Sequence, residues 1–399
     1  MSKDFLELGD LEMTSMITHI CLLSEQPSPN ICPLFDDRIK PDEITLLVTP
    51  QQIKRVNDVE TVLKKRHIKV NIVHIASAFD AEAVQAQVET LINNQKKLGN
   101  KTLINATGGT KPMSIGAFLA GFNHDIPVFY VNNDELTWLH NPQKDEGFEI
   151  AERLKLEDFL RMHGLELKTK QQSKISQNLN ELTNYLIRHP DLSPSIRQIN
   201  RIASYCIEDN QLNYLFTDKE LANQTLQATL DKFVDAELIK LKGHKLSFSN
   251  ITACRWCAGL WLEDFVYQQL DILKKLPELQ IQDLAESVEV IYANKARSQS
   301  EKVDNEIDVI FLADNRLYVI ECKTKVYSGK TSNNASEAIY KLATLKRELG
   351  GSQAKAMFVS YYPVRDEDKR RADLLGVEIC TGRQLQELSS RLKKWIKPF

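Results

Sequence analysis

The first part of the chain alternates short apolar runs with amphipathic stretches. The runs have the length of buried strands, and the stretches between them repeat apolar residues at helical spacing. Short buried strands separated by helices predict a mostly parallel sheet covered on both faces, and ligands of such sheets bind at the carboxyl ends of the strands. The strand-like runs are 17–23, 44–49, 70–75, 102–106 and 126–131, and the clearest helical patterns are 51–67 and 80–98.

Helical patterns dominate the segment from 151 to 250. The last of them, 222–234, is followed by a short hairpin over 239–248 that turns at Gly243. A helix followed by a small hairpin resembles a winged-helix unit. Two interpretations stay open, a structural connector and a module that reads DNA, and the pattern by itself favours the connector.

The last part of the chain returns to a mixed pattern of helices and strands. A long helix is followed by two adjacent strands, which predict a hairpin turning at Asp314 and Asn315. We therefore predict an α/β protein with three domains, 1–150, 151–250 and 251–399. In the last domain the expected helices are 259–273, 336–349 and 366–375, and the expected strands are 305–311, 318–324 and 356–361.

Composition places the chain among ordinary soluble proteins. It has 399 residues, 42% hydrophobic and 26% charged, with a net charge of −3, so no overall basic character indicates nucleic acid. The seven cysteines are odd in number and mostly in apolar surroundings, which favours a reduced, cytoplasmic environment. No signal-peptide pattern opens the chain, and no apolar run approaches the ~20 residues of a membrane span.

The predicted C-terminal hairpin places ionisable residues among Val, Ile and Phe. Asp308 lies on its first strand, and Glu321 and Lys323 share a face of the second, so pairing around the turn brings the three together. Buried charges of this kind need compensation, and we expect Mg²⁺ or Mn²⁺ held by the two carboxylates and the main-chain carbonyl of Cys322. Lys323 would then orient or deprotonate a water and offset negative charge in the transition state. The alternative is a purely structural, salt-bridged hairpin.

The helix before this hairpin offers a further carboxylate. Glu263 shares a helical face with Val266, Tyr267 and Leu270, so we expect it to point toward packed surface and to add a ligand for the metal. Asp264, one position round the helix, is expected to be solvated.

A second candidate site follows the apolar run at 102–106. There Thr107-Gly108-Gly109-Thr110-Lys111-Pro112-Met113 leads into a helical pattern. The two glycines let the backbone approach a ligand, the helix N-terminus supplies free N–H donors, and the threonines and Lys111 add hydroxyls and a full charge. We predict an anion pocket, with a tight structural turn as the alternative.

That second run resembles the signature of CARF domains, the CRISPR-associated Rossmann-fold sensors of cyclic oligoadenylate. The resemblance covers about residues 13–150 and includes the loop 24–30, with Gln26 and Asn30, and the strand end at Thr49. It implies a Rossmann-like domain, a homodimer, and one cyclic ligand bound across the two-fold axis by these residues and by Thr107, Gly108, Gly109, Thr110, Lys111 and Met113.

Residues 251–399 resemble the PD-(D/E)xK restriction-endonuclease-like superfamily. Glu263, Asp308 and Glu321-Cys322-Lys323 match its core helix, acidic strand and E-x-K strand, while Ile307 stands where the nominal motif has proline. The resemblance implies that Asp308, Glu321, Lys323 and Glu263 are catalytic, and that Asp308, Glu321, Glu263 and Cys322 hold the metal.

The combination is similar to the CARF nucleases of type III CRISPR systems. It implies a metal-dependent nuclease of antiviral defence, activated by cyclic oligoadenylate, above all cyclic tetra-adenylate, that cleaves DNA or RNA with little sequence specificity. Two other functions stay open. One is a non-catalytic, nucleotide-sensing regulator that binds nucleic acid, and the other is cleavage of the cyclic ligand by the sensor domain itself.

Further basic residues near the E-x-K strand are candidates for contacts to substrate phosphate. Lys330 follows on a loop, and Lys341, Lys346 and Arg347 fall on the next predicted helix. Contacts to the phosphate backbone need charge but no base reading, so such positions suit a nuclease of low specificity.

Overall fold

The computed structural model describes residues 15–132, 134–151, 153–171, 176–293, 305–326 and 335–397. It divides into two compact units, Met1–Arg153 and Leu154–Phe399, each of which is described by itself. The three predicted domains are a finer division and stay a prediction, and Lys330 lies outside the described residues. Among the described residues, no helix has both the length and the apolar character needed to cross a membrane.

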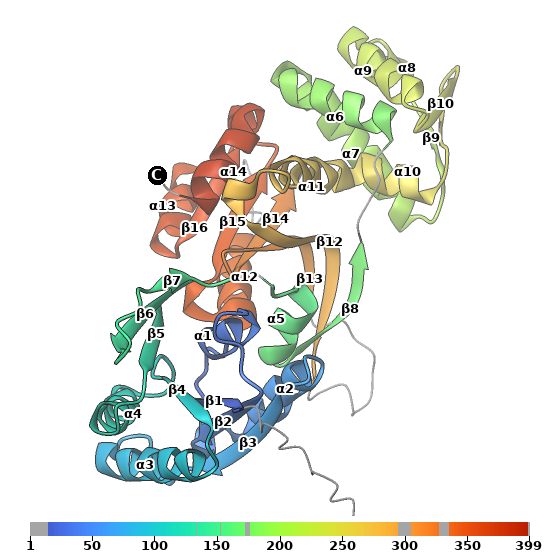
Figure 1. The fold of residues 1–399 in the computed structure, drawn as a ribbon. Helices are drawn as coiled ribbons and strands as arrows, with labels where there is room; N and C mark the ends of the chain where they lie inside the picture. Colours follow the sequence, from blue (N-terminus) through green and yellow to red (C-terminus); the bar gives the residue numbers. More distant parts are fainter. Residues whose placement is uncertain are drawn as a thin grey trace, which may run out of the picture. The chain divides into compact units, whose positions relative to one another are not determined.

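The first unit is built on a seven-stranded sheet in the order β3-β2-β1-β4-β5-β6-β7 (Figure 1). Its first five strands are parallel, as the alternation of strand and helix predicts. The chain builds outward from β1 to one side and then from β4 to the other, so the loops after β1 and β4 are neighbours at a topological switch point. The strands are β1 (Ile17–Leu22), β2 (Glu43–Val48), β3 (Lys69–His74), β4 (Lys101–Asn105), β5 (Val128–Asn132), β6 (Glu135–His140) and β7 (Phe148–Glu149).

Helices α3 and α4 pack against one another on this sheet. Their facing side chains are apolar, with Val84 and Val88 of α3 and Ala117 of α4 in one buried cluster with Ile104 of β4. This packing fixes the start of α4, which carries the predicted anion pocket. The helices of the unit are α1 (Ser28–Ile31), α2 (Ile53–Lys64), α3 (Ala81–Lys97) and α4 (Lys111–Asn123).

The second unit has a six-stranded mixed sheet in the order β16-β15-β14-β13-β12-β8. Helices α11 and α14 pack together beside it, and so do α12 and α13. The rings of Phe311 and Tyr318 stack 4.6 Å apart, and both meet Trp395 of α14 edge-on. The elements are β8 (Leu165–Gln171), β12 (Ile281–Tyr292), β13 (Asn305–Ala313), β14 (Arg316–Lys323), β15 (Lys355–Ser360), β16 (Val377–Thr381), α5 (Leu156–Met162), α11 (Trp261–Leu273), α12 (Ala335–Gly350), α13 (Asp366–Leu374) and α14 (Leu388–Ile396).

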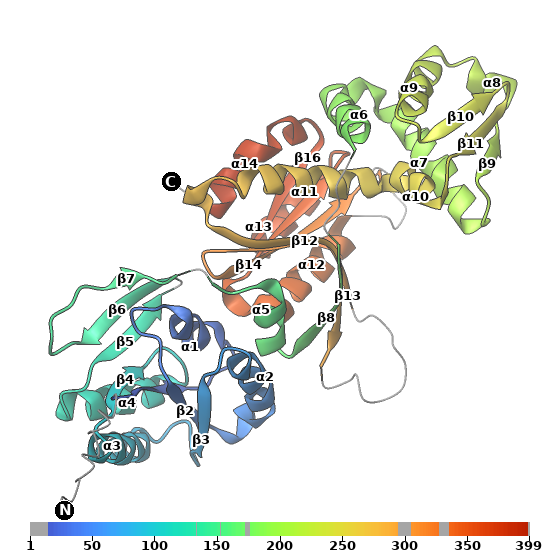
Figure 2. The ribbon, with the colours of Figure 1, turned by 45° about the vertical axis from the view of Figure 1, so that its right-hand side comes forward.

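Between β8 and α11 the chain forms a winged-helix-like insert (Figure 2). Its three-stranded sheet has the order β10-β11-β9, and Gly243 takes a positive φ of 57° at the hairpin turn. The insert shares a continuous apolar core with the nuclease-like sheet, and the Tyr362 hydroxyl donates to the Ser193 carbonyl at 3.0 Å. Its elements are α6 (Gln177–Arg188), α7 (Ser193–Glu208), β9 (Asn213–Leu215), α8 (Asp218–Leu221), α9 (Gln224–Asp235), β10 (Ile239–Lys242), β11 (Lys245–Phe248) and α10 (Ile251–Arg255).

An ion pair between buried Asp36 and half-exposed Arg38 closes the first unit. Asp36, only 2% exposed, accepts hydrogen bonds from the Arg38 guanidinium and from the N–H of Ala151, at 2.5 and 2.8 Å. Burial alone would raise the pKa of Asp36, but these donors outweigh it and hold the pKa at about 2. Arg38 also lies 3.8 Å over the ring of Phe148, so the pair ties the segment after α1 to the end of the sheet.

We predict that Asp36→Ala lowers the free energy of unfolding of the first unit by about 2 kcal/mol, because it leaves the Ala151 N–H without its acceptor and removes the charge-assisted hydrogen bonds from Arg38. Asp37→Ala is the matched control, since the Asp37–Arg153 pair is exposed and should contribute little. Urea unfolding of the full chain, followed by hydrogen exchange in peptides from this unit, measures the difference.

The effect of Asp36 should depend on pH in one direction. A folded pKa below the usual value of 3.8 means that the contribution is complete above that pH and is lost as the pH falls toward 2. The gap between the parent and Asp36→Ala should therefore shrink in acid. An equal gap at pH 3 and pH 7 would show that the ion pair does not act as described.

Candidate active site and ligand pocket

The β13–β14 hairpin brings the predicted acidic and E-x-K residues onto one face. Asp314 and Asn315 turn the chain with φ of 50° and 53°, which is the geometry of a tight two-residue hairpin. Val309 pairs with Ile320 across the strands, so the same register sets Asp308 beside Glu321. The turn and the coincidence of the two faces are both as predicted.

Lys323 contacts both carboxylates. Its Nζ lies 2.5 Å from Oε1 of Glu321 and 3.4 Å from Oδ2 of Asp308, and the N–H of Cys322 donates to the same Asp308 oxygen at 2.7 Å. Burial lowers the pKa of Lys323, but the Asp308 and Glu321 charges outweigh it and raise the pKa above its usual value. Burial and the Glu321 charge nonetheless raise the pKa of Asp308, so one lysine does not fully compensate the site.

Glu263 joins this cluster from the first turn of α11. Burial raises its pKa, and the Asp308 charge raises it further while Lys323 lowers it, so the two carboxylates interact electrostatically. Glu306, on the same face of β13 as Asp308, adds to this repulsion. Partly buried carboxylates in excess over one lysine are the donor set that a hard divalent cation prefers, so the residues present fit Mg²⁺ or Mn²⁺.

The expectation that Asp264 is solvated is wrong. Asp264 is 8% exposed and accepts a hydrogen bond from Nε1 of Trp256 at 2.8 Å. Burial and the Glu286 charge raise its pKa to about 7. The sequence pattern misplaced it because α11 is covered on several sides by the sheet, α14 and the insert, whereas the helical pattern assumed one solvated face.

Helix α11 begins at Trp261, two residues later than predicted, because Gly259 interrupts the helical path with a φ of 149°. A Cβ at this glycine would stand 2.4 Å from Oγ1 of Thr324, the residue after Lys323. The glycine therefore lets the start of the helix approach the E-x-K strand closely.

A cleft of about 950 Å³ opens at the E-x-K strand and is lined by Glu263, Lys323 and the insert. The residues that sequence reasoning missed are on its far wall, where Arg197 and Arg201 of α7 face it together with Arg255. Nothing in their local pattern indicates a site, because the helices that carry them lie far from the E-x-K strand in sequence.

Lys346 and Lys341, two of the other predicted contacts to substrate phosphate, differ in whether their side chains are engaged within the protein. Lys346 donates to the carbonyls of Leu375 and Gly376 at 3.1 and 3.0 Å, so it caps the end of α13 and is not available to substrate in this structure. Lys341 is exposed on α12.

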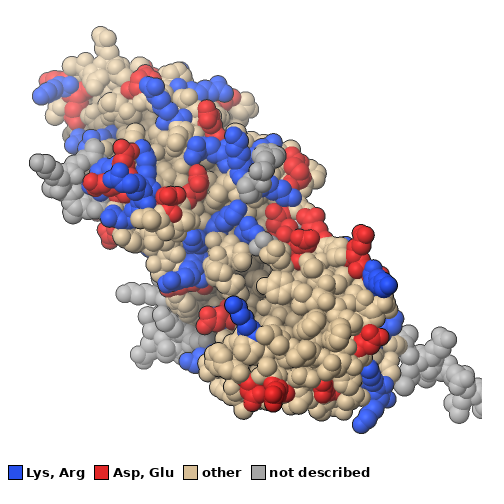
Figure 3. All heavy atoms as spheres, turned by 90° about the vertical axis from the view of Figure 1, so that its left-hand side faces the viewer, with Lys and Arg blue, Asp and Glu red and all other residues tan. Residues whose placement is uncertain are grey.

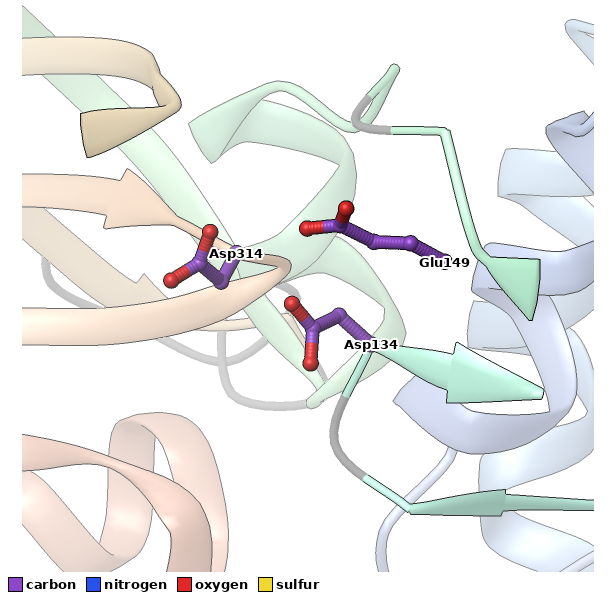
Figure 4. A group of neighbouring side chains, drawn as sticks. All are labelled: Asp134, Glu149 and Asp314. Carbon is purple, nitrogen blue, oxygen red and sulfur yellow. The ribbon is translucent and has the colours of Figure 1, made fainter. Parts of the chain in front are cut away.

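Figure 4 shows three further carboxylates, Asp134, Glu149 and Asp314. The first two belong to the first unit and the third to the second. Because the two units are described separately, these three carboxylates are not assigned to a metal site.

In the first unit, Asn105 organises the loop after β4. Its Oδ1 accepts from the N–H and hydroxyl of Thr107 at 3.0 and 2.6 Å, and its Nδ2 donates to the Pro29 carbonyl in the neighbouring loop. The Thr107 hydroxyl also accepts from the N–H of Val131 at 2.8 Å. The polar groups of Thr107 are therefore engaged inside the protein.

The predicted ligand residues fall into buried and accessible groups. Asn30 is fully buried and donates to the Leu22 carbonyl at 2.7 Å, and a Cβ at Gly108 would collide with that same carbonyl. Thr49 and Met113 are 4% and 1% exposed. Gly108 therefore lies close to Leu22 and Asn30, which brings the loop after β4 against the loop after β1.

Among the predicted ligand residues, the accessible ones are Lys111 and Gly109, with Gln26 and Thr110 half-buried. Thr110 is the N-cap of α4, where its hydroxyl accepts from the N–H of Met113. Lys111 therefore stands exposed at the positive end of a helix, which suits a phosphate group.

Comparison with known families and structures agrees with both halves of this description. The family model of the Card1 CARF domain matches residues 18–159, and that of the Card1-like endonuclease domain matches residues 251–398. No curated protein matches the chain.

Several solved structures share this fold, and three of them are compared with the chain. Protein VC1899 from Vibrio cholerae is 27% identical, with a TM-score of 0.87 over 96% of this chain and 98% of that one. Can2 from Sulfobacillus thermosulfidooxidans, solved in complex with cyclic tetra-adenylate, is 25% identical, with a TM-score of 0.77 over 96% and 99%.

The third is a type III CRISPR defence DNA nuclease activated by cyclic oligoadenylate. It is 18% identical, with a TM-score of 0.55 over 87% of this chain and 46% of that one, and shows likeness of fold alone. The chain therefore combines a Card1-type CARF domain with a Card1-like endonuclease domain, the organisation of the CRISPR-associated CARF nucleases.

Proposed function

We propose that this protein is a metal-dependent endonuclease of type III CRISPR defence, switched on by cyclic oligoadenylate, above all cyclic tetra-adenylate, and cleaving DNA or RNA with little sequence specificity. The observation that carries the proposal is the contact of Lys323 with both Asp308 and Glu321 within a domain that matches the Card1-like endonuclease family. The cyclic tetra-adenylate bound by Can2 supports the choice of activator.

Asp308, Glu321, Glu263 and the carbonyl of Cys322 would hold Mg²⁺ or Mn²⁺, and the ion would supply positive charge beside the scissile phosphate. The residues themselves do the rest. Lys323, positioned by the two carboxylates, offsets negative charge that builds up on the phosphate and orients the attacking water. Burial strengthens each of these interactions, because the surrounding Val, Ile and Phe side chains keep the local dielectric low.

Lys111 and the backbone N–H groups at the start of α4 would bind a phosphate of the activator, with Gly109, Thr110 and Gln26 beside it. Asn30, Thr49, Thr107, Gly108 and Met113 would shape the pocket, some of them from inside the protein. A ring of repeating phosphates suits two copies of the pocket related by a two-fold axis.

The surface of α4 supports a homodimer. Ile115, Leu119 and Phe122 follow one another at helical spacing and are 54%, 38% and 56% exposed. Figure 3 shows a broad area of the first unit without charged side chains on the side where α4 lies in Figure 1. An exposed apolar stripe of this kind is typical of an interface, and we propose that a second copy covers it.

We predict that Asp308→Ala lowers cleavage by about 1,000-fold, because it removes a metal ligand and the partner of Lys323. The double variant Glu321→Ala/Lys323→Ala should be as inactive. Cleavage is measured on single- and double-stranded DNA and RNA with Mg²⁺ or Mn²⁺, with and without cyclic tetra- and hexa-adenylate. Asp271→Asn, an exposed carboxylate on the same helix as Glu263, is the control and should cut normally.

Parent-level cutting by Asp308→Ala would show that the active site is elsewhere. Absence of cutting by the parent in every combination of metal, activator and substrate would favour the non-catalytic regulator. Circular dichroism and thermal unfolding establish that the variants remain folded.

Lys111→Glu should abolish activation by cyclic tetra-adenylate and weaken its binding by at least about tenfold, because it replaces an attractive charge at the phosphate by a repulsive one. Lys101→Glu provides the same charge change at the opposite end of β4 and should bind like the parent. Calorimetric titration gives the affinity, and sedimentation should show an unchanged dimer. Equal activation of both variants would place the ligand elsewhere.

The metal requirement should rise as the pH falls. Burial and neighbouring carboxylates raise the pKa of Asp308 to about 6 and that of Glu263 to about 9, so protons compete with the cation in this range. The Mg²⁺ concentration for half-maximal cleavage should therefore be lowest near pH 9 and highest near pH 6. Glu263→Gln should flatten the alkaline part of this profile, and a requirement independent of pH would contradict it.

A further inference from the structure

We propose that helix α7 of the insert is the substrate-binding wall of the nuclease, and that Arg197, Arg201 and Arg255 hold the phosphate backbone of a nucleic-acid strand as it enters the E-x-K site. This inference rests on the proposed nuclease function and assigns its binding surface. The insert lies between the two ranges that match known families, 18–159 and 251–398, so neither match gives α7 a role.

The placement of α7 is the first observation. Helix α7 packs beside α10 and the turn that precedes α11 (Figure 2). The cleft of about 950 Å³ has α7 on one side and Glu263, Lys323 and Thr324 on the other. A strand bound along α7 would therefore reach the proposed catalytic residues without leaving the cleft.

The sequence of α7 divides the helix into two faces. Ile196, Ile199 and Ile202 are buried in the core that the insert shares with the nuclease sheet. Arg197, Asn200, Arg201 and Ser204, at helical spacing, all line the cleft. The apolar face of α7 packs into the core and fixes the helix there, so the polar face lines the cleft.

The cleft has an excess of positive charge. Five basic side chains line it against two acidic ones, Glu220 and Glu263. Arg197 and Arg255 are exposed and form no ion pair within the described part of the chain, and Arg201 stands 3.9 Å from Glu220. In a protein with a net charge of −3, this local excess is a specific feature that attracts a polyanion.

Asn200 connects α7 to the active-site strand. In the amide orientation that satisfies both of its polar atoms, it donates to the carbonyl of Cys257 at 2.8 Å and accepts from Oγ1 of Thr324 at 3.3 Å. Thr324 directly follows Lys323. The arginine-bearing helix is thus held in a fixed relation to the catalytic residues.

The lining also indicates which part of the nucleic acid is bound. Among the described residues that line the cleft there is no Phe, Tyr or Trp, so this part of the lining offers bases no aromatic surface on which to stack. Arginines without such a platform contact phosphates, which are the same at every nucleotide. Recognition of the backbone alone gives a physical basis for low sequence specificity.

Helix α7 is not the helix that a winged-helix unit ordinarily presents to DNA. The helix that precedes the wing hairpin, α9, carries Asp231, Lys232 and Asp235 and has no basic excess. The wing hairpin does carry exposed lysines, Lys242 and Lys245 among them. The wing therefore provides a matched control, because the same number of positive charges can be removed there outside the cleft.

The test measures binding separately from cleavage. The full-length chain with Asp308→Ala is titrated against a fluorescent 20-nucleotide single strand, a duplex and an RNA, with cyclic tetra-adenylate present. Adding Arg197→Ala and Arg255→Ala should weaken binding about tenfold and flatten the slope of log affinity against log salt by about 0.7 to 0.9 for each lost contact. Lys242→Ala with Lys245→Ala should change neither value by more than twofold.

An abasic strand of equal length should bind the Asp308→Ala chain as well as a mixed sequence does. Unchanged binding by the arginine variant, an equal loss in the wing variant, or a tenfold weaker abasic strand would each overturn the inference. These outcomes are distinct from failure of the proposed function, which would appear as absence of cutting by the parent chain, whatever the binding data show.

Discussion

The nuclease half of this protein depends on one constraint, which is negative charge placed on a hairpin inside an apolar sheet. Asp308 is 9% exposed, and one lysine contacts both it and Glu321. Removing carboxylates from water costs more free energy than a single partner returns, and the raised pKa values of Asp308 and Glu263 reflect that deficit. The surrounding structure follows from this constraint. The Cys322 N–H bonds to Asp308, Gly259 lets α11 approach, and we propose that a cation compensates the remaining charge.

In the second unit buried carboxylates lack sufficient partners, whereas in the first unit polar side chains of the predicted ligand loops find hydrogen-bond partners inside the protein. Its ligand loops contain many hydrogen-bonding residues, but the Nδ2 group of Asn30 and the side chains of Asn105 and Thr107 form hydrogen bonds within the protein. The bond from Asn105 to the Pro29 carbonyl joins the end of β4 to the loop after β1, and the loops after β1 and β4 are neighbours because the strand order reverses there. The result is a preformed surface from which only a few groups project, Lys111 among them. A ligand then meets fixed donors and does not pay to order them.

Sequence alone predicted the features that depend on local pattern. The β13–β14 hairpin follows from alternation with period two and from turn residues that tolerate positive φ, and the face shared by Asp308, Glu321 and Lys323 follows from the same alternation. Features that depend on distant segments were missed or misplaced. The contact of Asn200 with Thr324 joins residues more than a hundred positions apart, and the burial of Asp264 results from several elements that cover one helix. Lys346 looked free on its helix because the carbonyls that it caps belong to the end of another helix.

The acidic and basic sides of the cleft make the two binding events interdependent. In the proposed function, a phosphate chain held by Arg197 and Arg255 would lie beside Glu263 in the same cleft, where a cation would offset the negative charge that the carboxylates and the phosphate bring together. Those carboxylates would in turn hold the cation more tightly in the presence of the phosphate chain. Thermodynamic linkage requires each ligand to raise the affinity for the other by the same factor. The coupling between phosphate binding and cation binding needs both the arginines of the insert and the carboxylates of the E-x-K site. In the proposed function, the insert and the E-x-K strand therefore act together.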